Sequence, residues 1–178
     1  MRNFSVFPAV AVCSHEWVWF KRNAYKHWLI VLVWILVIFG ASSDAGSSNR
    51  TSRIIGPIVR LLYPAISDQA LDHVVVAVRK TAHVTEYALL ALFVWRAIHR
   101  SRHLGPPRWS WEPREAFWSW ALATAYAGSD EIHQLFVPSR TGQVQDVLID
   151  SFGACLGLCF VWAYCRQRSR GGASGVCV

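Results

Sequence analysis

The amino-acid sequence predicts an all-α polytopic membrane protein with four transmembrane helices and a short interfacial helix in its first outer loop. Composition is the first indication: 53% of the 178 residues are hydrophobic and only 16% are charged, whereas a soluble domain carries about a quarter charged residues. Four apolar segments also reach the length of about 17–25 residues that crosses a bilayer. The basic residues flank these segments and do not interleave with stacking aromatics, so the net charge of +7 indicates topology signals and no nucleic-acid partner.

The four predicted spans divide the chain into an arm, a membrane domain and a tail. Residues 1–24 are interpreted as a cytoplasmic or interfacial N-terminal arm, because basic residues separate them from the first long apolar run. Residues 25–165 form the membrane domain, and residues 166–178 form a cytoplasmic tail. The spans cover about residues 25–43, 81–98, 116–136 and 146–164.

The first outer loop, residues 44–80, contains an apolar segment that is too short to span. Ile54–Ile66 has thirteen residues and is interrupted by Pro57 and Pro64. This pattern favours a short helix that lies on the outer interface. Ser67 then suits the N-cap of a further helix, which is expected to run unbroken into the second span and to project beyond the membrane.

The distribution of Lys and Arg predicts the orientation of the spans. The arm, the connection between the second and third spans, and the tail together hold twelve of the eighteen basic residues. Basic residues accumulate in cytoplasmic segments of plasma-membrane proteins. Both termini are therefore expected in the cytoplasm, which agrees with an even number of spans in a multi-pass membrane protein.

Ionisable residues gather at one end of three separate spans. His83 and Glu86 lie within about two turns of the outer end of the second span, at 1.5 Å of rise per residue. The stretch from Asp130 to Gln134 occupies the last two turns of the third span, and Asp146 to Asp150 begins the fourth. The helical rise therefore predicts that these groups share one depth near the outer leaflet.

These charges are expected to face one another and not the lipid. Each charge turned toward lipid would cost about 2.5–3.5 kcal/mol even on the most lenient insertion scale. The fourth span also carries Gly153 and Gly157 four residues apart, a spacing that permits close contact between helices. The sequence thus predicts an outward-facing polar pocket, closed deeper in the membrane by helix packing.

The chemistry of this pocket follows from its charge. Three basic residues oppose five carboxylates, so the pocket favours a cation, protonated histidines or carboxylates that share protons. Lys80 and Arg140 remain able to hold one phosphate or carboxylate group of a ligand. Two carboxylate–imidazole pairs at i, i+3 spacing also offer a site for a divalent metal such as iron, manganese or zinc. The candidate metal ligands are His83, Glu86, Asp130 and His133.

At these residues the sequence resembles the VanZ-like family of bacterial integral membrane proteins. Three blocks carry the resemblance: "SSDAGSSNRTS" after the first span, "RKTAHVTEYALL" at the second, and "DEIHQLFVPSRTGQVQDVLIDSFGACLG" around the third and fourth. Together with His133 from the residue pattern, the resemblance gives the following candidate pocket residues. They are Ser43, Lys80, His83, Glu86, Tyr87, Asp130, Glu131, His133, Gln134, Arg140, Asp146 and Asp150, with Gly153 and Gly157 as helix-packing residues.

The resemblance implies action at the cell envelope, because the family is named for a member linked to resistance against the glycopeptide teicoplanin. The first hypothesis is a pocket that binds an envelope lipid, a glycolipid headgroup or a lipid-linked envelope precursor. The second is a hydrolase or transferase on such a lipid, with His83 or Glu131 as general base. The third is a proton- or ion-coupled transporter that uses Glu86 and Asp150. The sequence assigns no oligomeric state.

Overall fold

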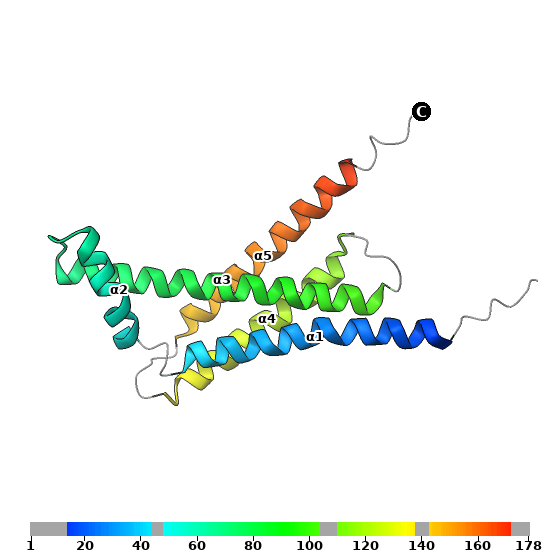
Figure 1. The fold of residues 1–178 in the computed structure, drawn as a ribbon, viewed down its shortest axis with the longest axis horizontal. Helices are drawn as coiled ribbons and strands as arrows, with labels where there is room; N and C mark the ends of the chain where they lie inside the picture. Colours follow the sequence, from blue (N-terminus) through cyan, green and yellow to red (C-terminus); the bar gives the residue numbers. More distant parts are fainter. Residues whose placement is uncertain (1–13, 44–47, 104–109, 138–142, 172–178) are drawn as a thin grey trace, which may run out of the picture.

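The computed structural model describes residues 14–43, 48–103, 110–137 and 143–171, and these residues form five helices and no strand. The all-α prediction is therefore confirmed for the described part of the chain (Figure 1). The helices are α1 Ser14–Ser42, α2 Ser48–Leu62, α3 Asp68–Arg102, α4 Pro113–Gln134 and α5 Val144–Gly171. The first helix begins eleven residues before the predicted span, so part of the predicted arm is helical.

Helix α3 is the centre of the fold, because it contacts all four of the other helices. Figure 1 shows α1 lying along α3, α5 crossing α3 at an angle, and α2 beside the start of α3. The 35 residues of α3 span roughly 50 Å at the rise of an α-helix. A hydrocarbon core is about 30 Å thick, so α3 is long enough to project beyond it.

The start of α3 confirms the cap that the sequence predicts. The Ser67 side chain accepts a hydrogen bond from the Ala70 backbone N–H. This bond satisfies one of the first N–H groups of the helix, which have no partner within the helix itself. The helix then continues without a break through the predicted second span to Arg102.

Helix α2 differs from the prediction at both ends and at Pro57. The helix covers Ser48–Leu62, and Pro57 lies inside it, whereas the sequence led us to expect Ile54–Ile66 with an interruption at this proline. Pro57 is exposed, so the carbonyl that loses its partner can be hydrated, and α2 is supported by its contact with α3. An exposed ion pair of 2.6 Å joins Arg60 to Asp68, and such pairs contribute little stability.

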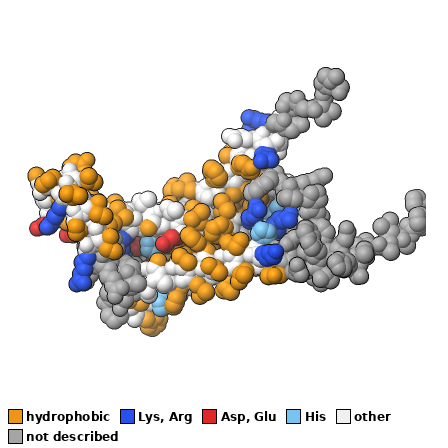
Figure 2. Space-filling view, viewed as in Figure 1, with side chains coloured by type: hydrophobic (Ala, Val, Ile, Leu, Met, Phe, Trp, Pro, Cys, Tyr) orange, Lys and Arg blue, Asp and Glu red, His pale blue; other side chains and the backbone are white. Residues whose placement is uncertain are grey.

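Two described helices are long and apolar enough to cross a membrane by length and composition: Tyr25–Ser42 of α1 and Val144–Arg170 of α5. They expose large apolar side chains such as Leu32 and Leu36 on α1 and Phe160 on α5. Figure 2 shows these surfaces as an apolar band between two charged ends. Such an extensive apolar surface marks contact with lipid or protein, and it fits a membrane protein.

The other two predicted spans lie within α3 and α4, which are not among the helices long and apolar enough to cross a membrane by length and composition. Ionisable side chains interrupt the apolar runs of both helices, and several of these side chains are buried inside the bundle. Residues 81–98 are wholly inside α3, and α4 ends at Gln134, two residues before the predicted end of the third span. The four-span topology with cytoplasmic termini therefore stays a prediction.

The core forms where α1, α4 and α5 meet the middle of α3. Tyr87, Leu90 and Trp95 of α3 are almost completely buried there. Two hydrogen bonds reach across to backbone oxygens: the Trp34 indole donates to Glu86, and the Tyr126 hydroxyl donates to Ile35. These bonds fix the rotation of α1 against its neighbours, because each requires one face of α1 to point inward.

Gly153 and Gly157 are the points where α5 lies closest to α3. A Cβ built on Gly153 would lie 2.5 Å from the Val84 carbonyl oxygen, and one on Gly157 would overlap the Ala88 carbonyl oxygen. Real Cβ atoms do not come this near to backbone, so only glycine permits the observed approach. The two glycines therefore hold the first turns of α5 against α3, and those turns carry two of the candidate pocket residues.

We expect Gly157→Ala to lower the melting temperature of the detergent-solubilised protein by an amount corresponding to about 1–3 kcal/mol, the usual cost of overpacking. Gly40→Ala is the matched control, because a Cβ there meets nothing within 4 Å; it should be neutral or stabilising by roughly 0.5–1 kcal/mol. Equal melting temperatures for the two variants would contradict the close approach.

Candidate functional site

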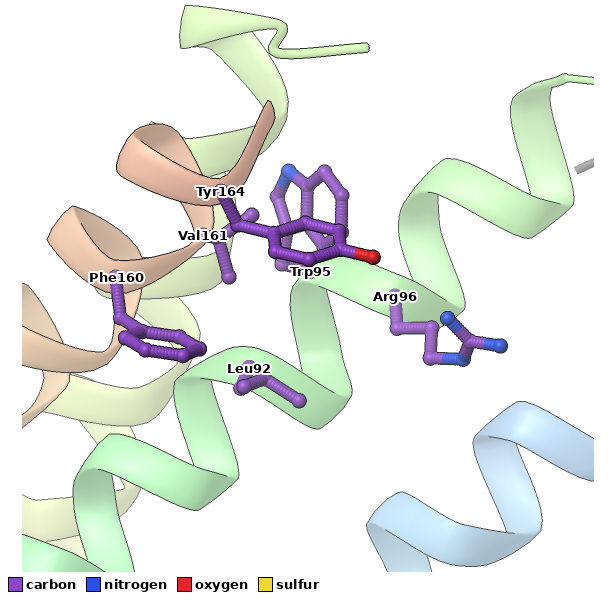
Figure 3. A pocket seen from close by; sticks show the side chains of 6 residues that line it. All are labelled: Leu92, Trp95, Arg96, Phe160, Val161 and Tyr164. Atoms are coloured by element: carbon purple, nitrogen blue, oxygen red, sulfur yellow. The ribbon is translucent and has the colours of Figure 1, made fainter. Parts of the chain in front are cut away.

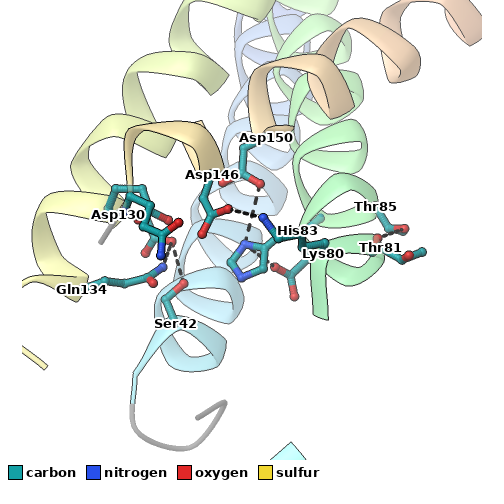
Figure 4. A network of polar contacts seen from close by, with 12 residues as sticks. Ser42, Lys80, Thr81, His83, Thr85, Asp130, Gln134, Asp146 and Asp150 are labelled. Carbon is teal, nitrogen blue, oxygen red and sulfur yellow. Dashed lines mark hydrogen bonds and ion pairs between the residues drawn. The ribbon is translucent and has the colours of Figure 1, made fainter. Parts of the chain in front are cut away.

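The candidate site lies where α1 and α4 end, where α5 begins, and beside the first half of α3. We call it the polar cluster. Figure 4 shows side chains of four helices pointing toward one another in this region. Its members are Ser42 from α1, Lys80, His83 and Glu86 from α3, Asp130, Glu131 and Gln134 from α4, and Asp146 and Asp150 from α5.

One half of the polar cluster joins α3 to α5. The Lys80 ammonium nitrogen lies 2.8 Å from a carboxylate oxygen of Asp146. One turn deeper, Nδ1 of His83 lies 3.7 Å from Oδ1 of Asp150 and 4.0 Å from Oε2 of Glu86. The His83 ring is therefore flanked by two carboxylates.

The other half joins α1 to α4. The Ser42 hydroxyl donates a hydrogen bond of 2.6 Å to Oδ2 of Asp130, and the Gln134 amide donates one of 3.1 Å to the same oxygen. The Glu131 carboxylate accepts a bond of 2.8 Å from the backbone N–H of Gln143. Glu131 thus ties the end of α4 to the residue that precedes α5, so both halves of the polar cluster are held together.

Several buried polar atoms at the centre of the polar cluster have no hydrogen-bond partner in the described part of the chain. Asp150 is 0% exposed, and neither of its carboxylate oxygens accepts a hydrogen bond from a described residue. The same holds for Oδ1 of Asp130 and for the hydroxyl of Tyr87. Burying such atoms unsatisfied costs about 1–3 kcal/mol each, and more for charged groups. The arrangement is therefore suited to a proton, a water molecule or a ligand that donates hydrogen bonds.

The electrostatic character of the polar cluster is acidic. Five carboxylates face one lysine and one histidine among its described members. Asp150 lies within electrostatic range of the other four carboxylates, and His83, 3.7 Å away, is the basic side chain that contacts it among the described residues. A cation, an amine or a group of hydroxyls fits this environment better than a bare anion does.

Two sequence-predicted residues have other positions than expected. The Ser43 hydroxyl bonds to the Gly40 carbonyl in its own helix, and its neighbour Ser42 reaches Asp130 instead. The His133 ring stacks on Phe39 of α1, with centroids 4.5 Å apart, and makes no described contact with His83. Arg140 lies outside the described residues.

Ser42 could have been found from the buried face of α1. Val31, Ile38 and Ser42 are buried and lie seven and four residues apart, which places them on one side of a helix. Ser43 is off this face. The family resemblance gave Ser43 as the candidate, whereas the helical period of the buried residues favours Ser42.

The four candidate metal ligands do not converge. In the described part of the chain, one group of three or more His, Cys, Asp or Glu residues has its ligand atoms within 4.8 Å of one another, and it is His99, His103 and Glu115. This group lies at the opposite end of α3 and was not singled out from the sequence. His83 lies against Asp150 of α5, whereas Asp130 bonds to Ser42 and His133 stacks on Phe39, both of α1.

An apolar cavity of about 170 Å³ lies away from the polar cluster, between α3 and α5 (Figure 3). Leu92, Trp95 and Arg96 line it from α3, and Phe160, Val161 and Tyr164 from α5. Figure 3 shows the Arg96 guanidinium at the edge of this space and turned outward. The cavity offers packing surface for apolar groups and no acid–base chemistry.

Comparison with known proteins adds one finding. The family model described as VanZ/LLP1 matches residues 27–165, which include all the described members of the polar cluster. Neither the curated proteins nor the solved structures give a match.

Ser42→Ala should destabilise the protein by about 1–3 kcal/mol, because it removes a buried hydrogen-bond donor from Asp130. Ser43→Ala is the matched control and should change stability by less than about 0.5 kcal/mol, because its hydroxyl bonds only to its own helix. Thermal unfolding of both purified variants measures the difference. A larger loss for Ser43→Ala would show that the wrong serine has been assigned to the polar cluster.

Proposed function

Because the chain belongs to the VanZ/LLP1 family, we propose that its polar cluster binds the headgroup of an envelope lipid or glycolipid at the outer face of the plasma membrane. The family links the protein to glycopeptide resistance, which is an effect on the cell envelope. The observation that carries the proposal is Asp150: a fully buried carboxylate with no hydrogen-bond partner among the described residues. A ligand that donates hydrogen bonds would satisfy it.

The proposal includes a four-span topology with both termini in the cytoplasm. Two helices have the length and composition of spans, and α3 and α4 pack between them, so all four would share one bilayer. The carboxylates of Asp130, Glu131 and Asp150 are buried in the bundle, as lipid requires. In this topology the polar cluster opens outward, and the basic ends of α3 and α5 lie on the cytoplasmic side.

The charge of the polar cluster narrows the class of headgroup. Asp150 and Oδ1 of Asp130 are acceptors without donors, and the described ammonium group of Lys80 is already paired with Asp146. Sugar hydroxyls and primary amines supply donors, whereas a phosphate supplies further acceptors. The proposed ligand is therefore a headgroup that presents hydroxyl or amine donors, as in a glycolipid, a lipid-linked saccharide or an aminated phospholipid.

The two carboxylates beside His83 also favour a second candidate function, a hydrolase or transferase acting on the same class of lipid. His83 lies between Asp150 and Glu86, so it has the neighbours of a general base that a carboxylate orients. Lys80 would then stabilise negative charge that develops on the substrate. Incubation of the protein with the lipid, followed by mass spectrometry of the lipid, distinguishes turnover from binding.

The topology predicts which residues react from outside the cell. In a variant whose five native cysteines are replaced by alanine, a cysteine at the exposed Asp68 should be labelled by a membrane-impermeant thiol reagent in intact spheroplasts. A cysteine at the exposed Arg170 should be labelled only after permeabilisation. The reverse pattern, or labelling of both positions in intact cells, would contradict an outward-facing polar cluster.

We expect a monoglycosyl diacylglycerol to raise the melting temperature of the purified protein, and Asp150→Asn to remove most of this rise. Loss of a hydrogen bond to a charged group is worth about 1.5–3 kcal/mol, so the affinity should fall at least about tenfold. Without lipid, Asp150→Asn should be as stable as the wild type or more so, because it removes a buried charge that lacks hydrogen bonds.

Two controls make this result specific. Asp72→Asn changes an exposed carboxylate on α3 and should leave the lipid effect intact. Diacylglycerol without the sugar should give a smaller rise with every variant. If Asp150→Asn and wild type respond equally to the glycolipid and to phosphatidylethanolamine, headgroup binding at the polar cluster is wrong.

A further inference from the structure

A second cluster of ionisable side chains lies at the other end of α3. His99 and His103 occupy the last turn of α3 and its C-cap, and Glu115 lies in the first turn of α4. The chain separates these residues by the connection between the two helices, and the fold brings them together. Figure 2 shows histidine and basic side chains gathered at this end of the molecule, across the apolar band from the polar cluster.

The three side chains converge on the Glu115 carboxylate. Nδ1 of His99 lies 2.8 Å from Oε2, and Nε2 of His103 lies 3.1 Å from Oε1. One ligand atom from each residue lies within 4.8 Å of the other two. Glu115 is 2% exposed and His99 is almost as buried, whereas the His103 side chain is 47% exposed. The group is thus closed toward the bundle and open on one side.

The surrounding structure holds these side chains in place before any ligand arrives. The His99 ring stacks nearly parallel on the buried Trp95 ring, with centroids 5.0 Å apart. The centroid of the His103 ring lies 4.4 Å from that of the His99 ring. Histidines four residues apart share one face of a helix. Both rings therefore point to Glu115 because of helix geometry and packing, so little ordering remains for a ligand to impose.

We propose that His99, His103 and Glu115 bind one divalent first-row transition-metal ion. Two imidazoles and one carboxylate suit zinc and iron, and such three-residue sets leave a coordination position for water or substrate. Bonds of about 2.0–2.2 Å to a tetrahedral ion require ligand atoms a little farther apart than the hydrogen bonds seen here. A small rotation of the half-exposed His103 supplies that change for its own contact with Glu115.

Arg102 provides a way to tell a metal site from a purely structural ion-pair group. Its Nε lies 3.6 Å from Oε1 of Glu115, and its side chain is half exposed. If the cluster only joins α3 to α4, Arg102 is one of its stabilising members. If the cluster binds a cation, Arg102 competes with that cation for the carboxylate and can turn into solvent when the ion binds.

The test uses the full-length protein in detergent, stripped with a chelator and titrated with Co²⁺ and Zn²⁺. We expect one equivalent of Co²⁺ to give the visible absorption of a protein-bound ion, which Zn²⁺ displaces, and Zn²⁺ to raise the melting temperature. His103→Ala and Glu115→Gln should each weaken Co²⁺ binding at least tenfold. Arg102→Ala should bind Co²⁺ as tightly as the wild type or more tightly.

The controls separate this site from the polar cluster and from adventitious binding. His73→Ala changes an exposed histidine on the same helix, and His83→Ala changes the histidine of the polar cluster; both should keep the Co²⁺ spectrum. No stoichiometric binding by the wild type, or equal binding by His103→Ala and Glu115→Gln, would overturn the proposal. Weaker binding by Arg102→Ala would also overturn it, in favour of a structural ion-pair group. None of these outcomes depends on what the polar cluster binds.

Discussion

The structure depends on the cost of placing carboxylates among apolar helices. Asp130, Glu131 and Asp150 are buried beside helices whose outer surfaces are almost wholly apolar. Outside the bundle these groups would meet lipid, where no hydrogen-bond donor is available and a charge costs several kcal/mol. Every described carboxylate of the polar cluster is therefore turned toward α3 or its neighbours. The carboxylates of α5 contact Lys80 and His83 of α3, and those of α4 contact Ser42 of α1 and the backbone of Gln143.

An apolar layer separates the two groups of ionisable residues. Between His83 and His99, α3 buries Tyr87, Leu90, Ala91 and Val94, and the facing parts of α4 and α5 carry no Lys, Arg, Asp or Glu in the described chain between 116 and 129 and between 151 and 165. A proton relay needs groups spaced through the bilayer. The described residues offer such groups only near the two ends, which favours binding or surface chemistry over coupled transport.

The sequence predicts features that depend on a single helix better than contacts that depend on how two helices pack. Helical rise alone predicts that His83, Asp130 and Asp150 lie at one end of their helices, and the cap at Ser67 is a local pattern. The contact between Ser42 and Asp130 depends on how α1 is rotated against α4, which only tertiary hydrogen bonds fix. His99, His103 and Glu115 are brought together by the angle between α3 and α4, a quantity that no local pattern contains.

The position of Asp150 is difficult to explain by packing and simple to explain by binding. An asparagine or leucine would fill the same space without a desolvated charge, so stability alone does not require a carboxylate there. One turn deeper, Gly153 holds α5 close to the Val84 backbone, which keeps the first turns of α5, and Asp150 with them, against α3. The backbone thus keeps an unsatisfied acceptor in a fixed position, and its burial cost is already contained in the fold. A donor that reaches Asp150 recovers part of that cost as binding free energy, which is how a preorganised site gains affinity.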